Sequence, residues 1–357
     1  MKKILALTTA LSAAGLGTAQ AEVVVMSWGG AYGMAQTEAH VKPFEKDTGI
    51  KATMLDSDNP AAPIKAMVEA GNVTVDIASL EYSDAVRLCD EGLLEEIDVS
   101  KLAAAPDGSA AADDFFEGAV TDCLVATDVW ATIYAYDETK FPGEKPATAA
   151  DFFDTAKFPG KRGMRKSPKT VIELALMADG VPAAEVYDVL ATPEGLDRAF
   201  KKLDTIKKDV VWWEAGAQPP QLLADGEVSM TMAYNGRIFN AVIGEGKPFV
   251  TVWDGMQYEF EGYVIPKGAP HLEDAIKFLD YSTSPEKLAD MTQYISYGPT
   301  RKSTATMERT YKDGKTVMAP YLPTTPANMT NAVETNFEFW VDHDADLKER
   351  FNAWLIN

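Results

Sequence analysis

Groups of opposite charge gather in two short stretches of the sequence, where they could hold a small ligand with a positive and a negative end. An apolar run over residues 228–233 ends in Tyr234-Asn235-Gly236-Arg237, and a later stretch carries Glu259, Glu261 and Tyr263. A carboxylate can pair with an ammonium group, and a guanidinium can bind a carboxylate through two parallel hydrogen bonds. The two stretches therefore predict a binding site for a small charged molecule.

The elements around these residues are expected to bring them to one edge of a sheet. The run 228–233 predicts a buried strand that passes through an Asn-Gly turn into a helix, so Tyr234 and Arg237 come at its carboxyl end. In open α/β sheets, ligands bind at the carboxyl ends of the strands. Further aromatic residues fall at element ends, and their faces attract ammonium groups. These are Trp28, Tyr32, Trp130, Tyr263 and Tyr297. Core packing is the alternative role for each of them.

Alternating strands and helices predict an α/β fold with two lobes. Strands are expected at 22–27, 51–55 and 73–80, with helices at 31–47, 63–70 and 84–91, a rhythm typical of a parallel sheet. A strand at 130–136 leads through a loop rich in Pro and Gly into a second series, with strands at 210–213 and 228–233 and helices at 171–178, 193–206 and 220–223. The helices expected at 271–282 and 284–294 return to the first lobe, and the helix expected at 345–355 returns to the second.

Length and charge agree with two lobes and exclude one class of partner. The chain has 357 residues and a formal net charge of −21. Its sequence pI is about 4.6. The electrostatic field of so acidic a protein repels nucleic acid, so no nucleic-acid partner is expected. A chain of this length is longer than a domain with a single hydrophobic core usually is, so two lobes are expected.

The first 21 residues have the pattern of a secretory signal. Lys2 and Lys3 precede an alanine-rich apolar stretch, and Ala19-Gln20-Ala21 has the form of a cleavage site. A membrane anchor is the alternative, but the apolar stretch is short for a span. We therefore expect a periplasmic protein. In an oxidising compartment, Cys89 and Cys123 are expected to form a disulfide, with two unpaired thiols as the alternative.

Catalytic and metal motifs are scarce. The three histidines lack zinc spacing, and no nucleophile elbow, phosphate loop or dinucleotide pattern occurs. The run Asp342-His343-Asp344-Ala345-Asp346 could hold a metal, but we favour capping at the start of the last helix. No cofactor is expected. An extracytoplasmic hydrolase that uses Glu259 and Glu261 is the alternative function, although no nucleophile with an oriented base supports it; a structural adhesin is a third.

Four motifs together resemble the periplasmic solute-binding proteins of ABC importers, in the spermidine/putrescine-binding family. They are Ser27-Trp28-Gly29-Gly30-Ala31-Tyr32, Cys89-Asp90-Glu91-Gly92-Leu93-Leu94, Trp212-Trp213 through Tyr234-Asn235-Gly236-Arg237, and Phe351-Asn352-Ala353-Trp354-Leu355. The resemblance implies a type II-like fold whose two lobes close over one solute and deliver it to a membrane permease. It places lobe 1 at 22–135 with 262–305, and lobe 2 at 136–261 with 306–357. We expect a monomer.

The resemblance also implies a set of binding residues. The family's positions fall on Trp28, Tyr32, Glu81, Ser83, Trp130, Tyr234, Glu261 and Tyr297. We add Tyr263 to the wall and Arg237 as the candidate for a ligand carboxylate.

Departures from the family leave the solute open between a polyamine and an ω-amino acid. Where spermidine binders carry two acids on the second lobe, this chain has Ser167 and Thr170, and Glu259 replaces an aromatic residue. Arg237 resembles a feature of γ-aminobutyrate binders. The alternative role for Arg237 is a structural ion pair with Glu259 or Glu261.

Overall fold

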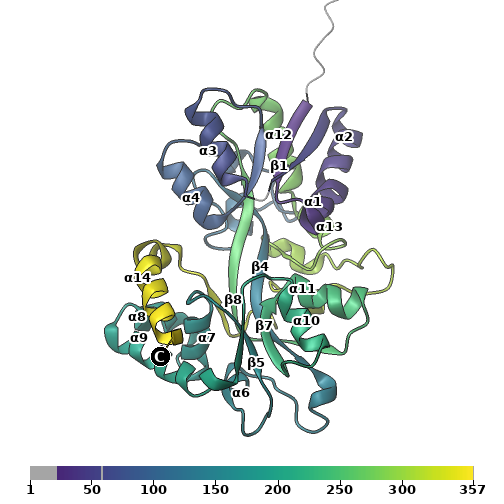
Figure 1. The fold of residues 1–357 in the computed structure, drawn as a ribbon. Helices are drawn as coiled ribbons and strands as arrows, with labels where there is room; N and C mark the ends of the chain where they lie inside the picture. The colour runs from purple at the N-terminus through teal and green to yellow at the C-terminus, as the bar shows by residue number, and fades with distance from the viewer. Residues whose placement is uncertain (1–21, 58, 357) are drawn as a thin grey trace, which may run out of the picture.

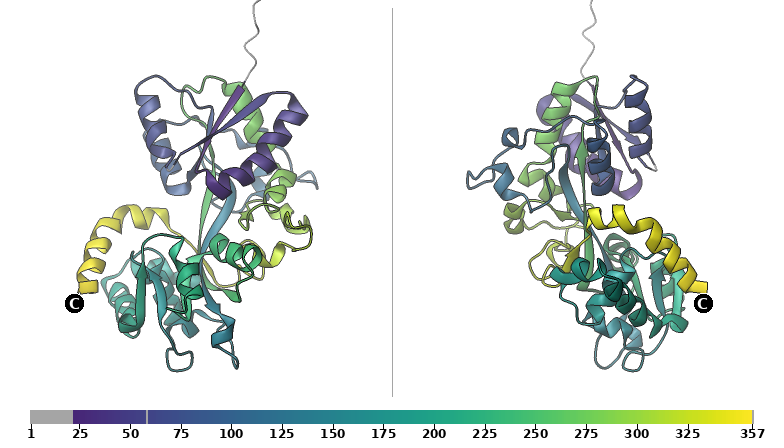
Figure 2. Two further views of the ribbon diagram at one scale, coloured as in Figure 1. Left: turned by 45° about the vertical axis from the view of Figure 1, so that its right-hand side comes forward. Right: turned by 90° about the vertical axis from the view of Figure 1, so that its left-hand side faces the viewer.

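A single ten-stranded sheet runs through the whole molecule. The computed structural model describes residues 22–57 and 59–356, so the predicted signal at 1–21 lies outside the described residues. The strand order is β2-β1-β3-β8-β4-β7-β5-β6, with β9 paired to β4 and β10 paired to β8. Helices pack around both ends of this sheet and form two lobes (Figure 1). Both views of Figure 2 show the same two lobes, one above the other.

Lobe 1, the upper one in Figure 1, contains a parallel unit of three strands. The strands are β1 (Glu22–Ser27), β2 (Lys51–Asp56) and β3 (Ile77–Glu81). Around them pack α1 (Gly30–Gln36), α2 (Lys42–Thr48), α3 (Ala61–Glu69), α4 (Tyr82–Asp90), α5 (Ala111–Asp114), α12 (Leu272–Ser282) and α13 (Pro285–Met291). A π-helix at Thr37–Val41 joins α1 to α2. Gly49, with a φ of 74°, ends α2 because glycine adopts the left-handed region without steric cost.

Lobe 2 is built in the same way around three further strands. They are β5 (Arg162–Arg165), β6 (Val210–Trp213) and β7 (Met230–Tyr234). Its helices are α6 (Ala149–Phe153), α7 (Val171–Ala178), α8 (Val186–Leu190), α9 (Pro193–Asp204), α10 (Gln218–Ala224), α11 (Asn235–Phe239) and α14 (Phe337–Ile356). The π-helix Asn240–Gly244 follows α11.

Two long antiparallel strands connect the lobes. They are β4 (Val125–Asp137) and β8 (Phe249–Val264), which pair from Val125↔Tyr263 to Asp137↔Phe249. We call them the crossing strands (Figure 1). β8 also pairs with β3 in lobe 1, and β4 pairs with β7 in lobe 2. The short strands β9 (Gly298–Pro299) and β10 (Ala332–Glu334) add to the sheet near this junction.

The last helix differs from its prediction. It begins at Phe337 rather than near Ala345, so residues 342–346 lie inside the helix and do not cap its start. The first turn is fixed to lobe 2 by Trp340, whose Nε1 donates to the buried Glu173 on α7 over 2.9 Å. A contact between residues so distant in sequence leaves no local signal for the start of a helix.

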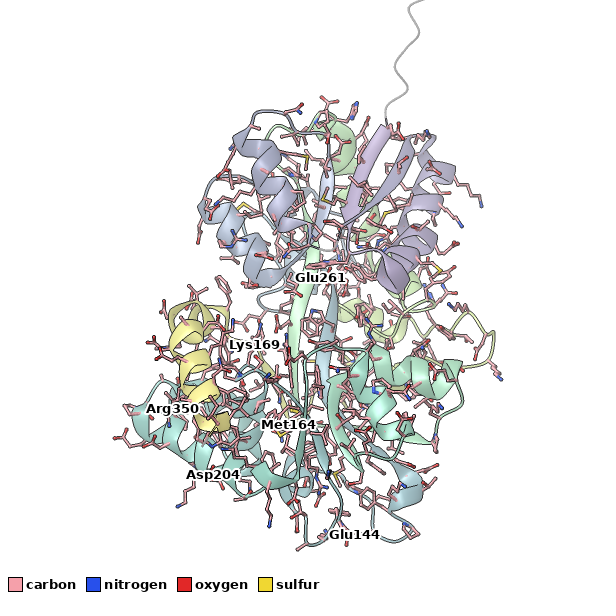
Figure 3. The ribbon with its side chains drawn as sticks, in the orientation of Figure 1. Glu144, Met164, Lys169, Asp204, Glu261 and Arg350 are labelled. Carbon is pink, nitrogen blue, oxygen red and sulfur yellow. A yellow bond between two sulfur atoms is a disulfide. The ribbon has the colours of Figure 1, made fainter. Side chains whose placement is uncertain are left out.

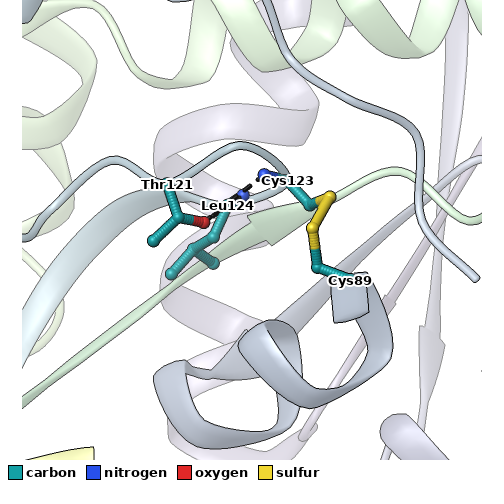
Figure 4. The surroundings of a disulfide bond; sticks show 4 residues. All are labelled: Cys89, Thr121, Cys123 and Leu124. Atoms are coloured by element: carbon teal, nitrogen blue, oxygen red, sulfur yellow. Dashed lines mark hydrogen bonds between the residues drawn. A yellow bond between two sulfur atoms is a disulfide. The ribbon is translucent and has the colours of Figure 1, made fainter. Parts of the chain in front are cut away.

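The predicted disulfide is present in lobe 1. Cys89, near the end of α4, is bonded to Cys123, just before β4 (Figure 4). The Thr121 hydroxyl accepts a hydrogen bond from the Leu124 amide at 3.1 Å. The bridge therefore ties α4 to the segment that enters a crossing strand. Over the described residues, no helix combines the length and apolar character needed to cross a membrane.

Candidate functional site: a charged cavity between the lobes

A cavity of about 910 Å³ lies between the lobes beside the crossing strands. Eight of the ten predicted binding residues line it: Trp28, Tyr32, Glu81, Trp130, Tyr234, Arg237, Glu261 and Tyr297. Figure 3 shows Glu261 at the end of β8 that enters lobe 1. We call this space the interlobe cavity.

Two predicted residues lie elsewhere. Ser83 lines a neighbouring second cavity of about 430 Å³, between α4 and α14. Tyr263 is completely buried in lobe 1, where its hydroxyl lies 3.0 Å from His40 Nδ1 and its ring packs against Phe278. Tyr263 therefore belongs to the core and not to the cavity wall.

A row of three carboxyl groups lies at the junction of the lobes, where Glu81 and Glu261 line the interlobe cavity and Asp128 is buried beside them. Glu261 on β8 is the register partner of Glu81 on β3 and of Asp128 on β4. Side chains of directly paired residues lie on the same face of a sheet. Glu81, Glu261 and Asp128 therefore stand side by side across three strands, and we call them the carboxylate row.

Hydroxyl groups support this row from lobe 1. The Ser79 hydroxyl donates to Glu261 Oε1 at 2.9 Å. The hydroxyls of Tyr32 and Thr127 donate to Asp128 Oδ2 at 2.7 and 2.8 Å. The other Asp128 oxygen, Oδ1, is buried and has no hydrogen-bond partner in the described part of the chain.

Burial and neighbouring acids dominate the electrostatics of the carboxylate row, although Lys169 and Arg165 partly lower the pKa of Glu81. Burial raises the pKa of Glu261 well above its usual range, and the charges of Asp128 and Glu81 add to the effect. Burial likewise raises the pKa of Asp128. The pKa of Glu81 rises to about 7 because of burial and the nearby Glu259 carboxylate. A bound cation would lower these pKa values again, since an opposite charge favours the ionised carboxylate.

Aromatic rings enclose the space beside the row. Trp130 meets Tyr234 edge to face with ring centroids 5.4 Å apart, and the centroids of Tyr32 and Tyr297 are 5.9 Å apart. Trp28 enters from the loop after β1, where Gly29 has a φ of 67°. A Cβ at Gly29 would lie 2.8 Å from the Asp56 carboxyl group. Position 29 therefore requires glycine, because a side chain there would not fit in the loop that carries Trp28.

Cationic side chains approach from lobe 2. Arg237 on α11 lines the interlobe cavity, is exposed, and makes no ion pair or hydrogen bond with its side chain among the described residues. The Arg165 guanidinium lies over the Tyr234 ring, 6.0 Å from its centroid. Glu259, the alternative partner for Arg237, instead pairs with Lys169 at 2.7 Å. The structural pairing of Arg237 with Glu259 or Glu261 is therefore not found.

The sequence analysis missed Asp128, Ser79 and Lys169. Asp128 had a visible signal, because an acid inside the apolar stretch before Trp130 must find a role in a buried strand. Ser79 and Lys169 become notable only through register and packing. Thr170, one of the two positions aligned with family acids, is buried with a φ of 72°, and neither it nor Ser167 lines the interlobe cavity. The described residues hold no cluster of three or more His, Cys, Asp or Glu side chains suited to a metal ion.

Two α/β lobes joined by crossing strands, with a charged and aromatic cavity between them, define a protein that binds a small solute. The chain belongs to the family of bacterial extracellular solute-binding proteins, whose model matches residues 39–319. The predicted family resemblance and fold class are confirmed. This is the solute-binding component of an ABC importer.

Relatives and solved structures agree over nearly the whole chain. The chain is 43% identical over 333 residues to a γ-aminobutyric acid-binding protein of Pseudomonas aeruginosa, covering 93% of this chain and 90% of the relative. An ABC transporter substrate-binding protein from Bradyrhizobium japonicum is 33% identical, with a TM-score of 0.79 and coverage of 94% and 99% of the two chains. A structure described as a GABA receptor is 34% identical, with a TM-score of 0.76 and coverage of 94% and 97%.

Proposed function

We propose that the protein captures a short ω-amino acid, such as γ-aminobutyrate, in the periplasm and delivers it to a membrane ABC permease. The observation that carries the proposal is that Glu81 and Glu261 of the carboxylate row line the interlobe cavity from lobe 1, while Arg237, which has no ion-pair partner among the described residues, lines it from lobe 2. A molecule with an ammonium group at one end and a carboxylate at the other complements both. The name of the Pseudomonas relative supports the same ligand.

Each group of cavity residues has a role in this proposal. Glu261 and Glu81 bind the ammonium group, and Arg237 binds the carboxylate. Trp28, Tyr32, Trp130, Tyr234 and Tyr297 form the apolar wall around the methylene chain. Charge-assisted hydrogen bonds contribute about 1.5–3 kcal/mol each, more than neutral ones. Ser83 and Tyr263 are not included, because they lie outside the interlobe cavity.

The proposed mechanism is closure of the lobes over the solute. We propose that lobe 1 comprises 22–135 with 262–305 and lobe 2 comprises 136–261 with 306–357. β4 and β8 pair in both lobes, with a shift of register between Thr132 and Tyr134, and this arrangement supports a hinge within these strands. Closure would exclude water and strengthen both charged contacts. We further propose that the protein acts as a monomer, without enzymatic activity or a nucleic-acid partner.

Calorimetric titration tests the ligand. γ-Aminobutyrate is expected to bind with micromolar affinity or better, and Glu261→Gln and Arg237→Gln are each expected to weaken it by roughly tenfold to a hundredfold. Glu349→Gln, an exposed change on α14, is the control. Tight binding of spermidine or putrescine without binding of γ-aminobutyrate would instead make the protein a polyamine binder. Turnover of the ligand would indicate the hydrolase.

A further inference from the structure

The second cavity contains an ion pair that the binding of an ω-amino acid does not use. Lys169 Nζ lies 2.7 Å from Glu259 Oε1, and only 7% of the Glu259 side chain is exposed. Both residues line the second cavity, together with Ser83 and Trp340. Figure 3 shows Lys169 beside the crossing strands, on the side toward α14. The pair therefore neutralises an acid that is largely removed from water.

Glu259 stands next to the carboxylate row. It lies two residues before Glu261 on β8, so both side chains emerge on the same face, roughly 7 Å apart along the strand. Its register partner is Trp130, which lines the interlobe cavity. The separation of Glu259 and Glu261 is comparable to the span of a short α,ω-diamine. Without Lys169, the two acids would form a site for two ammonium groups.

The backbone before α7 is held in an unusual conformation beside Lys169. Thr170 has a φ of 72° and is the one non-glycine residue with positive φ in the described part of the chain. Its buried hydroxyl has no hydrogen-bond partner among the described residues. A β-branched residue in this region is strained, and such strain often occurs at ligand sites. The segment that carries Lys169 is therefore fixed in place by its surroundings.

We propose that the Lys169–Glu259 ion pair is a specificity element that rejects diamines and polyamines. A diamine bound through the carboxylate row would bring its second ammonium group toward Lys169 instead of a free carboxylate. Discrimination between similar ligands commonly needs such a repulsive group. An ω-amino acid avoids it, because its second charge is negative. The inference deepens the proposed function and rests on it for the identity of the accepted ligand.

The test compares putrescine and γ-aminobutyrate by calorimetry on four proteins. They are the wild type, Lys169→Gln, Lys169→Gln with Glu259→Gln, and Lys166→Gln. Lys169→Gln is expected to strengthen putrescine binding by between roughly tenfold and a hundredfold, because Glu259 becomes free to pair with an ammonium group. The double variant should lose this gain. Lys166→Gln is a matched control, since Lys166 forms an exposed pair with Glu214 at 2.9 Å on the same segment.

The results separate this inference from the proposed function. Unchanged putrescine affinity in Lys169→Gln, or a gain that persists in the double variant, would overturn the inference. A loss of γ-aminobutyrate binding in Lys169→Gln without any gain for putrescine would also overturn it, and would make Lys169 a ligand for the carboxylate. If wild type fails to bind any ω-amino acid while Lys169→Gln gains putrescine, the ion pair is a diamine barrier and only the proposed function fails. Circular dichroism of each variant establishes that it is folded.

Discussion

Glu81 and Glu261 are register partners on the neighbouring strands β3 and β8, with their carboxyl groups on one face of the sheet. Burial raises the pKa of both acids, and neighbouring carboxylates add to each shift: Asp128 and Glu81 for Glu261, and Glu259 for Glu81. The pair therefore holds protons that ordinary surface glutamates release. A ligand ammonium group placed between them would reverse this effect, because it favours the ionised forms.

Ligand binding is therefore expected to release protons. Below pH 7 Glu81 is mainly protonated, since its pKa is about 7, and the bound cation lowers that pKa. Affinity for γ-aminobutyrate should rise between pH 5 and 7, by up to about tenfold per pH unit for each proton released. Calorimetry at pH 6 in phosphate and in a buffer with a large ionisation enthalpy measures the number of protons.

The Glu81→Gln variant provides the control for this linkage. It should release fewer protons and show a flatter dependence of affinity on pH, because one titrating group is gone. Equal heats in the two buffers for the wild type would show that ligand binding is not linked to these carboxyl groups.

Arg237 should recognise only one end of the ligand. Arg237→Gln is expected to weaken γ-aminobutyrate binding by about 1.5–3 kcal/mol, the range for hydrogen bonds to charged groups. The same change should leave the weaker binding of n-butylamine within about threefold, because that ligand has no carboxylate. Titration of both ligands into both proteins gives a double-mutant cycle. Equal losses for the two ligands would show that Arg237 does not bind the carboxylate.

Local patterns in the sequence predict most of the elements but not their tertiary supports. The strand at 22–27, the helix at 171–178 and the strand at 210–213 agree with the structure at both ends, because their apolar periodicity is uninterrupted. The true start of the last helix depends on Trp340 reaching Glu173, which no local pattern contains. A long-range contact thus decides where this helix begins.

In the candidate site, too, local sequence patterns identify some residues and long-range contacts decide the position of others. Glu261 and Trp130 were predicted from the residue pattern and from the family resemblance, while the place of Asp128 beside Glu261 follows from the register of β4 with β8. Tyr263 shares the strand of Glu261, but it lies two residues further into lobe 1, where His40 and Phe278 cover it. Sequence position shows which strand a side chain belongs to, whereas packing at the ends of that strand decides whether it meets the cavity.

The disulfide should stabilise lobe 1 without contributing to ligand recognition. Cys89 and Cys123 are separated by 34 positions, and closing a loop of that length corresponds to roughly 4 kcal/mol in the chain-entropy model. Replacing both cysteines by Ala should lower the free energy of unfolding by about that amount. Urea titration with and without a reducing agent measures it, and the reducing agent should affect only the wild type. A reduced protein as stable as the oxidised one would contradict the expectation.

Glu173 is a buried acid in lobe 2 that should make the stability of the protein depend on pH. The hydroxyl of Tyr187 and the Nε1 of Trp340 donate to its Oε1 at 3.0 and 2.9 Å. Burial raises its pKa to about 7. The folded protein thus keeps a proton that the unfolded chain releases above pH 4.5, so this group makes stability fall as pH rises from about 4.5 to 7.

Glu173→Gln should remove this dependence on pH while keeping an oxygen that accepts from Trp340. Relative to the wild type, the variant is expected to gain up to about 3 kcal/mol in free energy of unfolding between pH 5 and 8. Urea titrations at the two pH values measure the gain, with the exposed Glu185→Gln on the same lobe as a control. A difference between Glu173→Gln and wild type that stays constant with pH would mean that Glu173 is ionised in the folded protein even at pH 5. Its two donors, Tyr187 on α8 and Trp340 on α14, would then hold these helices to α7 through a charged group and not through a neutral one.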